Sequence, residues 1–288
     1  MEFLAPTTWA DALAARSEHP GAVPIAGGTD LMVELNFDRH RPAGLLDLTR
    51  VPELRDWQRS EDAGVRLGAG VTFARVMTEL SGLAPGLAMA SRTVGSPQIR
   101  VRGTLGGNLG SASPAGDAHP VLLAVDAVVE VESVRGTRRI PVAEFFTGVK
   151  RSALEPDELI AAVLLPPVAG PQQFAKIGTR NAMVIAVASF ALALHPAARR
   201  VGTGIGSAAP TPRRAPAAED LLAGELDWDG RAPLGASVVR RFGELVAEAA
   251  DPIDDVRGSA AYRRHALAVL AARTATWAWD EYCTREAS

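Results

Sequence analysis

The chain has 288 residues, of which 47% are hydrophobic and 22% charged, a composition typical of a globular protein and unlike that of a disordered one. Its formal net charge is −3 with no basic block, so binding of a nucleic acid or an anionic membrane has no electrostatic support. Cys283 is the only cysteine, which excludes a disulfide within the chain and an iron–sulfur cluster held by this chain alone.

No targeting or membrane segment is expected. The N-terminal residues lack the charged and apolar regions of a secretion signal. The longest apolar run, residues 182–194, is too short to span a bilayer. We therefore expect a cytoplasmic protein that contacts neither membrane nor nucleic acid.

Residues 1–55 predict a small α/β unit. Thr7 or Thr8 can cap a helix that runs to Arg16, and the hydrophobic pattern predicts strands at residues 22–26 and 45–48 and a helical turn at 30–35. The pair Gly27-Gly28 falls between the first strand and this turn, where Thr29 or Asp30 could cap the helix. Unpaired N–H groups at such a junction favour a phosphate group.

Residues 56–170 predict a second α/β unit. Its expected elements are a strand at 65–69, helices at 72–80, 87–94 and 120–125, two strands at 128–134 and 138–142 joined by a turn at Arg135-Gly136, and a strand at 157–165. The intervening run 104–117 is rich in glycine and serine and predicts a loop that contributes little to the core. Prolines mark the expected domain boundary at residues 166–171.

The last third, residues 171–288, predicts strands followed by helices. The strands are expected at residues 172–177, 184–194 and 199–205, and the helices at 215–222, 236–250 and 259–279. There is no internal repeat and no low-complexity linker.

Two glycine-containing loops indicate binding chemistry. Loop 1 comprises residues 25–32 and loop 2 residues 104–108, followed by Ser113 and Asp117. Paired glycines let a bound group approach the backbone and let successive N–H groups turn toward an anion such as a diphosphate. Asp117 could accept hydrogen bonds from ribose, ribityl or amide groups. Either loop alone could be an ordinary turn, and for loop 1 alone the turn is the commoner explanation, but together the two could hold one dinucleotide.

The sequence lacks the usual motifs of other nucleotide-binding, metal-binding and hydrolase sites. There is no Walker loop, and neither Gly68-Ala69-Gly70 nor the glycines of residues 202–206 complete the GxGxxG of a Rossmann dehydrogenase. The five histidines lack the paired spacing of metal ligands. No GxSxG segment occurs, although a Ser-His-Asp triad built from distant residues stays open.

Several short motifs, and the order in which they occur along the chain, resemble those of a known protein family. The loops read Ala26-Gly27-Gly28-Thr29-Asp30-Leu31 and Thr104-Leu105-Gly106-Gly107-Asn108, and Ser113-Pro114-Ala115-Gly116-Asp117 follows. Further matching segments are residues 98–100, 144–146, 158–160, Lys176 with Arg180, 254–259 and 262–263. In this order and over nearly the whole chain, they resemble the FAD-binding medium subunit of the xanthine dehydrogenase family of molybdenum hydroxylases.

The resemblance implies an α+β fold. Two N-terminal α/β subdomains, residues 1–55 and 56–170, would form a PCMH-type FAD-binding domain, and residues 171–288 would form a C-terminal domain with an antiparallel sheet and helices. It also implies an FAD-carrying electron-transfer subunit that takes electrons from [2Fe–2S] clusters on a small partner subunit and passes them to NAD or another acceptor. A large partner subunit with a molybdenum cofactor would oxidise the substrate, for which a purine such as xanthine or hypoxanthine is our first choice. The expected assembly is a dimer of heterotrimers.

The resemblance further implies which residues hold FAD, and no catalytic acid or base among them. Loops 1 and 2 would wrap the diphosphate with backbone N–H groups, Ser113 would add a hydroxyl, and the remaining side chains would contact the cofactor. The full set is Ile25, Ala26, Gly27, Gly28, Thr29, Asp30, Leu31, Met32, Thr104, Leu105, Gly106, Gly107, Asn108, Ser113, Asp117, Leu154, Lys176 and Ile185.

Alternatives stay open for several of these residues. Leu154 is equally well explained by ordinary packing, Lys176 by a solvated surface position, and Ile185, which family members can place against the isoalloxazine ring, by the core. Arg180 could stabilise anionic flavin states, but a salt bridge to an acid is the preferred interpretation.

Two departures from the family pattern affect function. Val101 stands where many relatives have asparagine, and Asn181-Ala182-Met183 stands where several NAD-linked members carry an acid. The second departure leaves the electron acceptor open, because nearby charge tunes a bound cofactor. Two other functions also remain: a self-contained FAD-dependent oxidoreductase of the same fold, and a non-catalytic assembly subunit.

Overall fold

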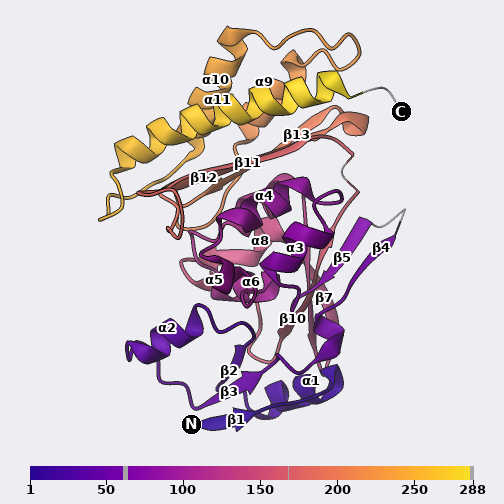
Figure 1. The fold of residues 1–288 in the computed structure, drawn as a ribbon, viewed down its shortest axis with the longest axis vertical. Coiled ribbons are helices and arrows are strands. Elements are labelled where there is room, and N and C mark those ends of the chain that lie inside the picture. Colours follow the sequence, from indigo (N-terminus) through magenta and orange to yellow (C-terminus); the bar gives the residue numbers. More distant parts are fainter. Residues whose placement is uncertain (61–63, 168, 286–288) are drawn as a thin grey trace.

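The computed structural model describes residues 1–60, 64–167 and 169–285. Three parts are stacked along the long axis of the molecule: a small N-terminal unit, a second unit in the middle, and a C-terminal domain whose three helices cover the far end (Figure 1). No helix in these ranges is long and apolar enough to cross a membrane. Residue 168 of the expected boundary lies outside the described ranges.

The N-terminal unit is a three-stranded parallel sheet in the order β1-β3-β2. Its elements are β1 (Glu2–Leu4), α1 (Trp9–Glu18), β2 (Ala22–Ile25), α2 (Leu31–Asn36) and β3 (Gly44–Asp47). Thr8 is the residue that caps α1, since its side chain accepts a hydrogen bond from the N–H of Asp11 at 3.2 Å. Strand β1 was not predicted because it has only three residues, two of them exposed.

The second unit is built on a five-stranded antiparallel sheet in the order β4-β5-β10-β6-β7. The strands are β4 (Trp57–Ser60), β5 (Gly64–Gly68), β6 (Val128–Ser133), β7 (Gly136–Pro141) and β10 (Leu159–Leu165). The 3-10 turn η1 (Pro52–Leu54) leads into this unit. Its helices are α3 (Phe73–Glu79), α4 (Pro85–Thr93), α5 (Pro97–Arg100), α6 (Leu105–Ser111), α7 (Ala118–Ala124) and α8 (Val142–Phe145), and a small hairpin consists of β8 (Phe146–Gly148) and β9 (Arg151–Ser152).

The C-terminal domain confirms the expected antiparallel sheet with helices. Its sheet has the order β11-β12-β13, and α9, α10 and α11 cover one face (Figure 1). The elements are β11 (Gln172–Ile177), β12 (Ala188–His195), the 3-10 turn η2 (Pro196–Ala198), β13 (Arg200–Gly206), α9 (Pro216–Glu225), α10 (Ala236–Ala249) and α11 (Ala260–Thr284). Residues 184–187, predicted as strand, are irregular and lie in the connection between β11 and β12.

Strand β12 is buried on both faces. Its larger side chains, Phe190, Leu192 and Leu194, pack in the core under the C-terminal helices, whereas Ala191 and Ala193 belong to the core of the second unit. Side chains of a strand alternate between faces, so one strand serves two cores. The alanine face leaves room for α7 to approach the sheet closely.

Helix α7 lies directly on the backbone of β13. A Cβ on Gly204 would lie 1.9 Å from the carbonyl oxygen of Pro120, and one on Gly202 would lie 2.0 Å from that of Ala124. Any side chain at these positions would therefore push the helix away. The glycines of residues 202–206 serve this domain contact.

The predicted loop 104–117 is wrong in its first half, because residues 105–111 form α6. Thr104 caps this helix through a hydrogen bond from Gly107 N–H to its Oγ1 at 3.0 Å. Leu105 and Leu109 are fully buried, contrary to the expectation that the run adds little to the core. Burial and the cap outweigh the low helix propensity of the three glycines in α6.

Candidate functional site

Loop 1 presents a row of unpaired backbone N–H groups. Gly28 has a left-handed backbone (φ +73°), and its carbonyl oxygen accepts from Met32 N–H at 3.1 Å as the chain enters α2. No residue of the described ranges accepts a hydrogen bond from the N–H groups of residues 27–31. The predicted side-chain cap by Thr29 or Asp30 does not form. Five successive free donors at a helix start can bind an anion.

Loop 1 contacts the backbone of the segment that leads into loop 2. A Cβ on Gly27 would lie 2.0 Å from the carbonyl oxygen of Arg102, and one on Gly103 would lie 3.4 Å from Thr29 Oγ1. Only glycine fits at position 27, because the obstacle is a backbone carbonyl group. The fold thus brings loop 1 against the residues that precede loop 2.

Four of the five backbone N–H groups of loop 2 are not the free donors that we expected. The N–H groups of Leu105 and Gly106 donate to Val71 and Ala69 carbonyl oxygens at 3.0 and 2.8 Å. Those of Gly107 and Asn108 donate to Thr104 Oγ1 and to its carbonyl oxygen, each at 3.0 Å. These four groups are therefore engaged within the protein, and the prediction that they face a diphosphate is wrong.

What loop 2 does offer is a side-chain acceptor and an open surface. Asn108 Oδ1 is buried and has no hydrogen-bond partner among the described residues. Gly107 is exposed, and an added Cβ there would meet only Thr104 Oγ1, at 3.0 Å. A ligand lying on loop 2 would therefore contact a glycine surface and could donate to Asn108.

Asp117 and Lys176 form a buried ion pair. Lys176 Nζ donates to Asp117 Oδ2 at 2.6 Å and to the Thr93 carbonyl oxygen at 3.1 Å, and Thr93 Oγ1 donates to the same Oδ2 at 3.1 Å. The two side chains are only 6% and 7% exposed, so the surface interpretation of Lys176 is wrong. Burial raises the pKa of Asp117, and the neighbouring ammonium and hydroxyl groups lower it in part. Asp117 Oδ1 is buried without a partner in the described ranges.

His119, which was not predicted as a site residue, connects loop 2 to the segment around Asp117. Its Nε2 lies 3.1 Å from the Asn108 carbonyl oxygen, and Gly116 packs so closely that a Cβ there would lie 2.2 Å from the ring. Complete burial lowers the pKa of His119 to about 4, so the ring is neutral near pH 7 and acts as a structural group. Its position in Asp117-Ala118-His119-Pro120 was the only sequence signal.

Ser113 lies at the turn that precedes Asp117. Its Oγ accepts from Ala115 N–H at 3.3 Å, and its carbonyl oxygen accepts from Gly116 N–H at 3.0 Å. The C-terminal domain holds this turn, since Ser207 N–H donates to the Pro114 carbonyl oxygen at 2.9 Å.

The remaining predicted residues lie away from these contacts. Leu154 is half-buried against the core of the second unit. Ile185 is 52% exposed in the connection between β11 and β12, so the interpretation as plain core is wrong. Arg180 donates to the Met183 carbonyl oxygen at 3.1 Å, and it pairs with no carboxylate in the described part of the chain, which contradicts the preferred salt bridge.

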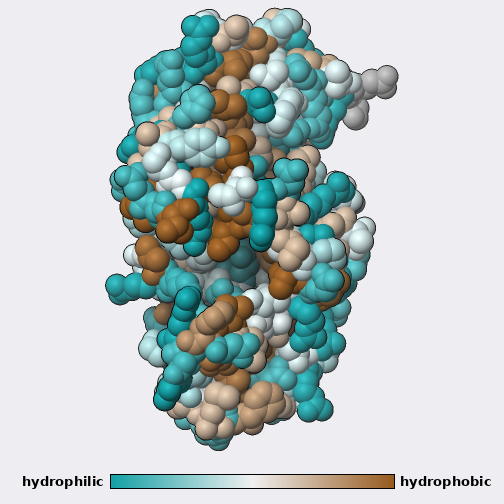
Figure 2. Space-filling view, turned by 60° about the vertical axis from the view of Figure 1, so that its left-hand side comes forward, coloured by the Kyte–Doolittle hydropathy of each residue, from teal (hydrophilic) through white to brown (hydrophobic). Residues whose placement is uncertain are grey.

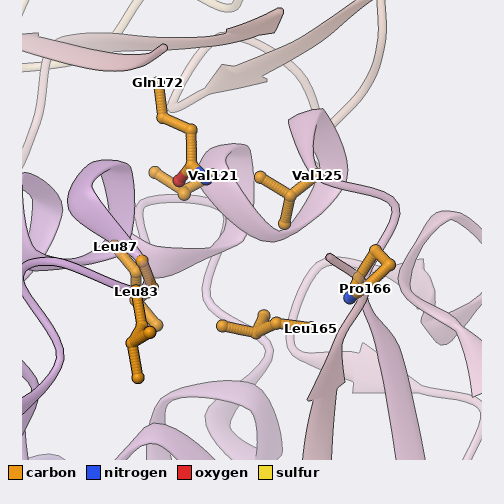
Figure 3. Close-up of a pocket in the computed structure, with 8 residues that line it drawn as sticks. Leu83, Leu87, Val121, Val125, Leu165, Pro166 and Gln172 are labelled. Carbon is orange, nitrogen blue, oxygen red and sulfur yellow. The ribbon is translucent and has the colours of Figure 1, made fainter. Parts of the chain in front are cut away.

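Two pockets in the structure are unsuited to a dinucleotide. One, of about 10 Å³, lies where Gln172 reaches from β11 toward α4 and α7, among apolar side chains such as Leu87 and Val121 (Figure 3), and has room for about one water molecule. The other, of about 290 Å³, is lined by three acidic residues, Glu53, Asp56 and Glu132, against one basic residue, Arg66, and this acidic excess disfavours a diphosphate. The side that carries α2 is hollowed at mid-height, with hydrophobic surface above and below (Figure 2).

Contacting glycine loops, free N–H groups and a buried acid with an unused oxygen fit a protein that binds a dinucleotide cofactor. Comparison with known proteins identifies the cofactor. Residues 1–168 match the family described as the FAD binding domain in molybdopterin dehydrogenase, and residues 173–278 match the CO dehydrogenase flavoprotein C-terminal domain. The chain belongs to the FAD-binding subunits of the molybdenum hydroxylases, and its cofactor is FAD.

Relatives with several different activities are similar over almost the whole chain. A putative xanthine dehydrogenase FAD-binding subunit of Escherichia coli strain K12 is 31% identical and covers 91% of this chain and 90% of its own. The nicotine 6-hydroxylase medium subunit of Paenarthrobacter nicotinovorans is 32% identical, with 95% of both chains covered. A structure of carbon monoxide dehydrogenase from Hydrogenophaga pseudoflava, which lacks the Mo-pyranopterin moiety of its cofactor, is 26% identical with a TM-score of 0.87 and covers 97% of this chain and 98% of that one.

Proposed function

We propose that the chain is the electron-transfer subunit of a molybdenum hydroxylase complex. It would receive electrons from [2Fe–2S] clusters on a small subunit and deliver them to NAD or another acceptor, while a large subunit with the molybdenum cofactor oxidises the substrate. The observation that carries the proposal is the pair of contacting glycine loops within a chain that matches the FAD-binding family over both of its domains. Bound FAD supplies the redox chemistry, and the protein supplies position and electrostatics.

Different residues of the chain would bind different parts of FAD. The free N–H groups of residues 27–31 would hold the diphosphate, and the exposed Gly107 would form the surface on which it lies. The predicted neighbours Ile25, Ala26 and Met32 shape loop 1. Asp117 and Lys176 would hold a polar part of the cofactor, and Ile185 would lie near the ring.

We also propose a substrate and an electron acceptor for the complex. A purine is the proposed substrate, supported by the similarity to the E. coli subunit, although the relatives named above also include nicotine and carbon monoxide enzymes. The exposed segment around Met183 carries no acid, so acceptors other than NAD are included. We propose a cytoplasmic dimer of heterotrimers as the assembly.

An absorption spectrum of the purified chain tests the flavin site. We expect flavin bands that move to the supernatant after acid precipitation, and their loss in Gly107→Val, whose new side chain would project from the exposed surface of loop 2. Gly82→Val is the matched control, because no atom lies within 4 Å of a Cβ there. A wild-type chain that stays colourless with excess FAD contradicts the proposal.

Purification of the native complex through a tag on this chain tests the partners and the substrate. We expect two further subunits, one with iron–sulfur absorption, and bleaching of the flavin by xanthine or hypoxanthine. Bleaching by nicotine or carbon monoxide instead would keep the electron-transfer role and replace the purine.

A further inference from the structure

Arg263 is a buried cation near the start of α11, and it holds two strand ends. Its side chain is only 4% exposed. Its Nη1 donates to the carbonyl oxygens of Val187, at 2.7 Å, and Ser207, at 2.5 Å. Val187 immediately precedes β12 and Ser207 immediately follows β13, so one nitrogen atom fixes the spacing of two neighbouring strand ends.

The strand end at Val187 leads to Lys176. The N–H of Val187 donates to the carbonyl oxygen of Ile177 at 2.8 Å, and Ile177 follows Lys176 as the last residue of β11. The guanidinium group therefore holds, through one intervening residue, the strand end that carries the ammonium group of the Asp117–Lys176 pair.

The strand end at Ser207 leads to Asp117. The N–H of Ser207 donates to the Pro114 carbonyl oxygen at 2.9 Å, and Pro114 lies in the turn that Gly116 N–H closes by donating to the Ser113 carbonyl oxygen at 3.0 Å. Asp117 is the next residue along the chain. The main-chain connections to the two members of the pair therefore meet at the side chain of α11 that holds both strand ends.

A buried charge is a costly means of adding stability. Removal of a guanidinium group from water is unfavourable, and a buried ion pair is often no more stable than apolar side chains of the same volume. Neighbouring residues of α11 in the same core are apolar, among them Ala266 and Leu267. What arginine adds is a planar group with several donors in fixed directions, which sets the geometry of its acceptors. Asp255 Oδ1 accepts from Nη2 of Arg263 at 2.6 Å and compensates the charge.

We propose that Arg263 is a positioning residue of the flavin site, which fixes the spacing of Asp117 and Lys176 through the main chain and makes no contact with FAD. This inference rests on the proposed function, which assigns a polar part of FAD to that pair. Without the guanidinium group, the ends of β12 and β13 are free to separate, and the carboxylate and ammonium groups no longer meet FAD together.

A double-mutant cycle on FAD affinity tests this connection. The full-length chain is freed of flavin and titrated with FAD, with flavin fluorescence as the signal, for wild type, Arg263→Met, Lys176→Met and the double variant. Because small misplacements weaken a positioned interaction strongly, Arg263→Met should raise the Kd about 10-fold when Lys176 is present. In the Lys176→Met background it should raise the Kd by less than about twofold, because the spacing of the pair matters only while both groups are present.

Two further variants separate positioning from a general loss of stability. Leu267→Ala removes a fully buried side chain one turn further along α11. It should lower the free energy of unfolding to a similar extent as Arg263→Met, while the Kd for FAD stays within about twofold of wild type. Arg263→Lys keeps a cation with donors for the same acceptors, so it should recover part of the affinity lost in Arg263→Met. The lysine variant also takes the place of Arg263→Met in the cycle if the methionine variant does not fold.

The outcomes separate this inference from the proposed function. A wild-type chain that binds no FAD defeats both. If wild type binds FAD and Arg263→Met binds it no more weakly than Leu267→Ala does, the positioning role is overturned and the proposed function stands. Equal weakening by Arg263→Met in both backgrounds also overturns the role, because the loss then does not pass through the pair. So does an Arg263→Lys variant that binds FAD no better than Arg263→Met.

Discussion

Gly204→Ala tests the contact between α7 and β13. The new Cβ would lie 1.9 Å from the carbonyl oxygen of Pro120, and to reach even 3.0 Å the helix and the strand must separate by more than 1 Å. Such a gap also loosens the alanine face of β12. Overpacking of a tight core costs about 1–3 kcal/mol, and a backbone obstacle that no rotamer can avoid places this variant near the upper end, about 3 kcal/mol.

Urea unfolding followed by tryptophan fluorescence measures this loss, with Gly224→Ala as the control. Gly224 lies in the last turn of α9 and an added Cβ meets nothing within 4 Å, so the same substitution there should be neutral or stabilising by up to about 1 kcal/mol. The two variants are therefore expected to differ in sign. A free energy of unfolding for Gly204→Ala within about 0.5 kcal/mol of wild type would refute the close-packing argument.

Three further predictions concern His119, the two arginines that pair with Asp255, and Gly27. Burial lowers the pKa of His119 from 6.5 to about 4, so the free energy of unfolding is at its full value above pH 6.5 and falls by up to about 3 kcal/mol as the pH drops toward 4. In His119→Gln, the free energy of unfolding measured in urea should depend less on pH over this range. An unchanged pH dependence would contradict the assignment. Arg263→Met removes the buried partner of the Asp255 carboxylate and should destabilise the protein by about 3 kcal/mol or more. Arg257→Met removes a half-exposed guanidinium from the same carboxylate and should change stability by less than about 1 kcal/mol. Equal effects of the two substitutions would argue against the role of burial. Gly27→Ala should lower FAD affinity at least about 10-fold, since it forces the two loops apart, and equilibrium dialysis that finds unchanged affinity would exclude this loop contact as a determinant of binding.

Local sequence patterns correctly predicted the elements that are themselves rich in hydrophobic residues. The runs that became β6, β10 and β12 are β-branched or aliphatic over most of their length, and the structure confirms strands there. Glycines at loop 1 also marked a real strand-to-helix junction, because only glycine fits against the neighbouring carbonyl group at Gly27.

Features that depend on distant partners were missed. Helix α6 contains three glycines, and it forms because Thr104 caps it and Leu105 and Leu109 reach the core, neither of which its propensity reveals. Lys176 lies 59 residues from Asp117, and no local pattern indicates that the two side chains meet. The edge strand β4 is polar and has no hydrophobic alternation to detect.

The seating of α7 on the glycines of β13 has a mechanical consequence. Side chains can change rotamer and let two elements slide, but here a carbonyl oxygen of the helix rests on the bare backbone of the strand at Gly202 and again at Gly204. Two such supports on one helix resist both translation and rocking. The FAD-binding domain and the C-terminal domain are therefore fixed to each other by main-chain contacts, which a change of side-chain rotamer cannot release.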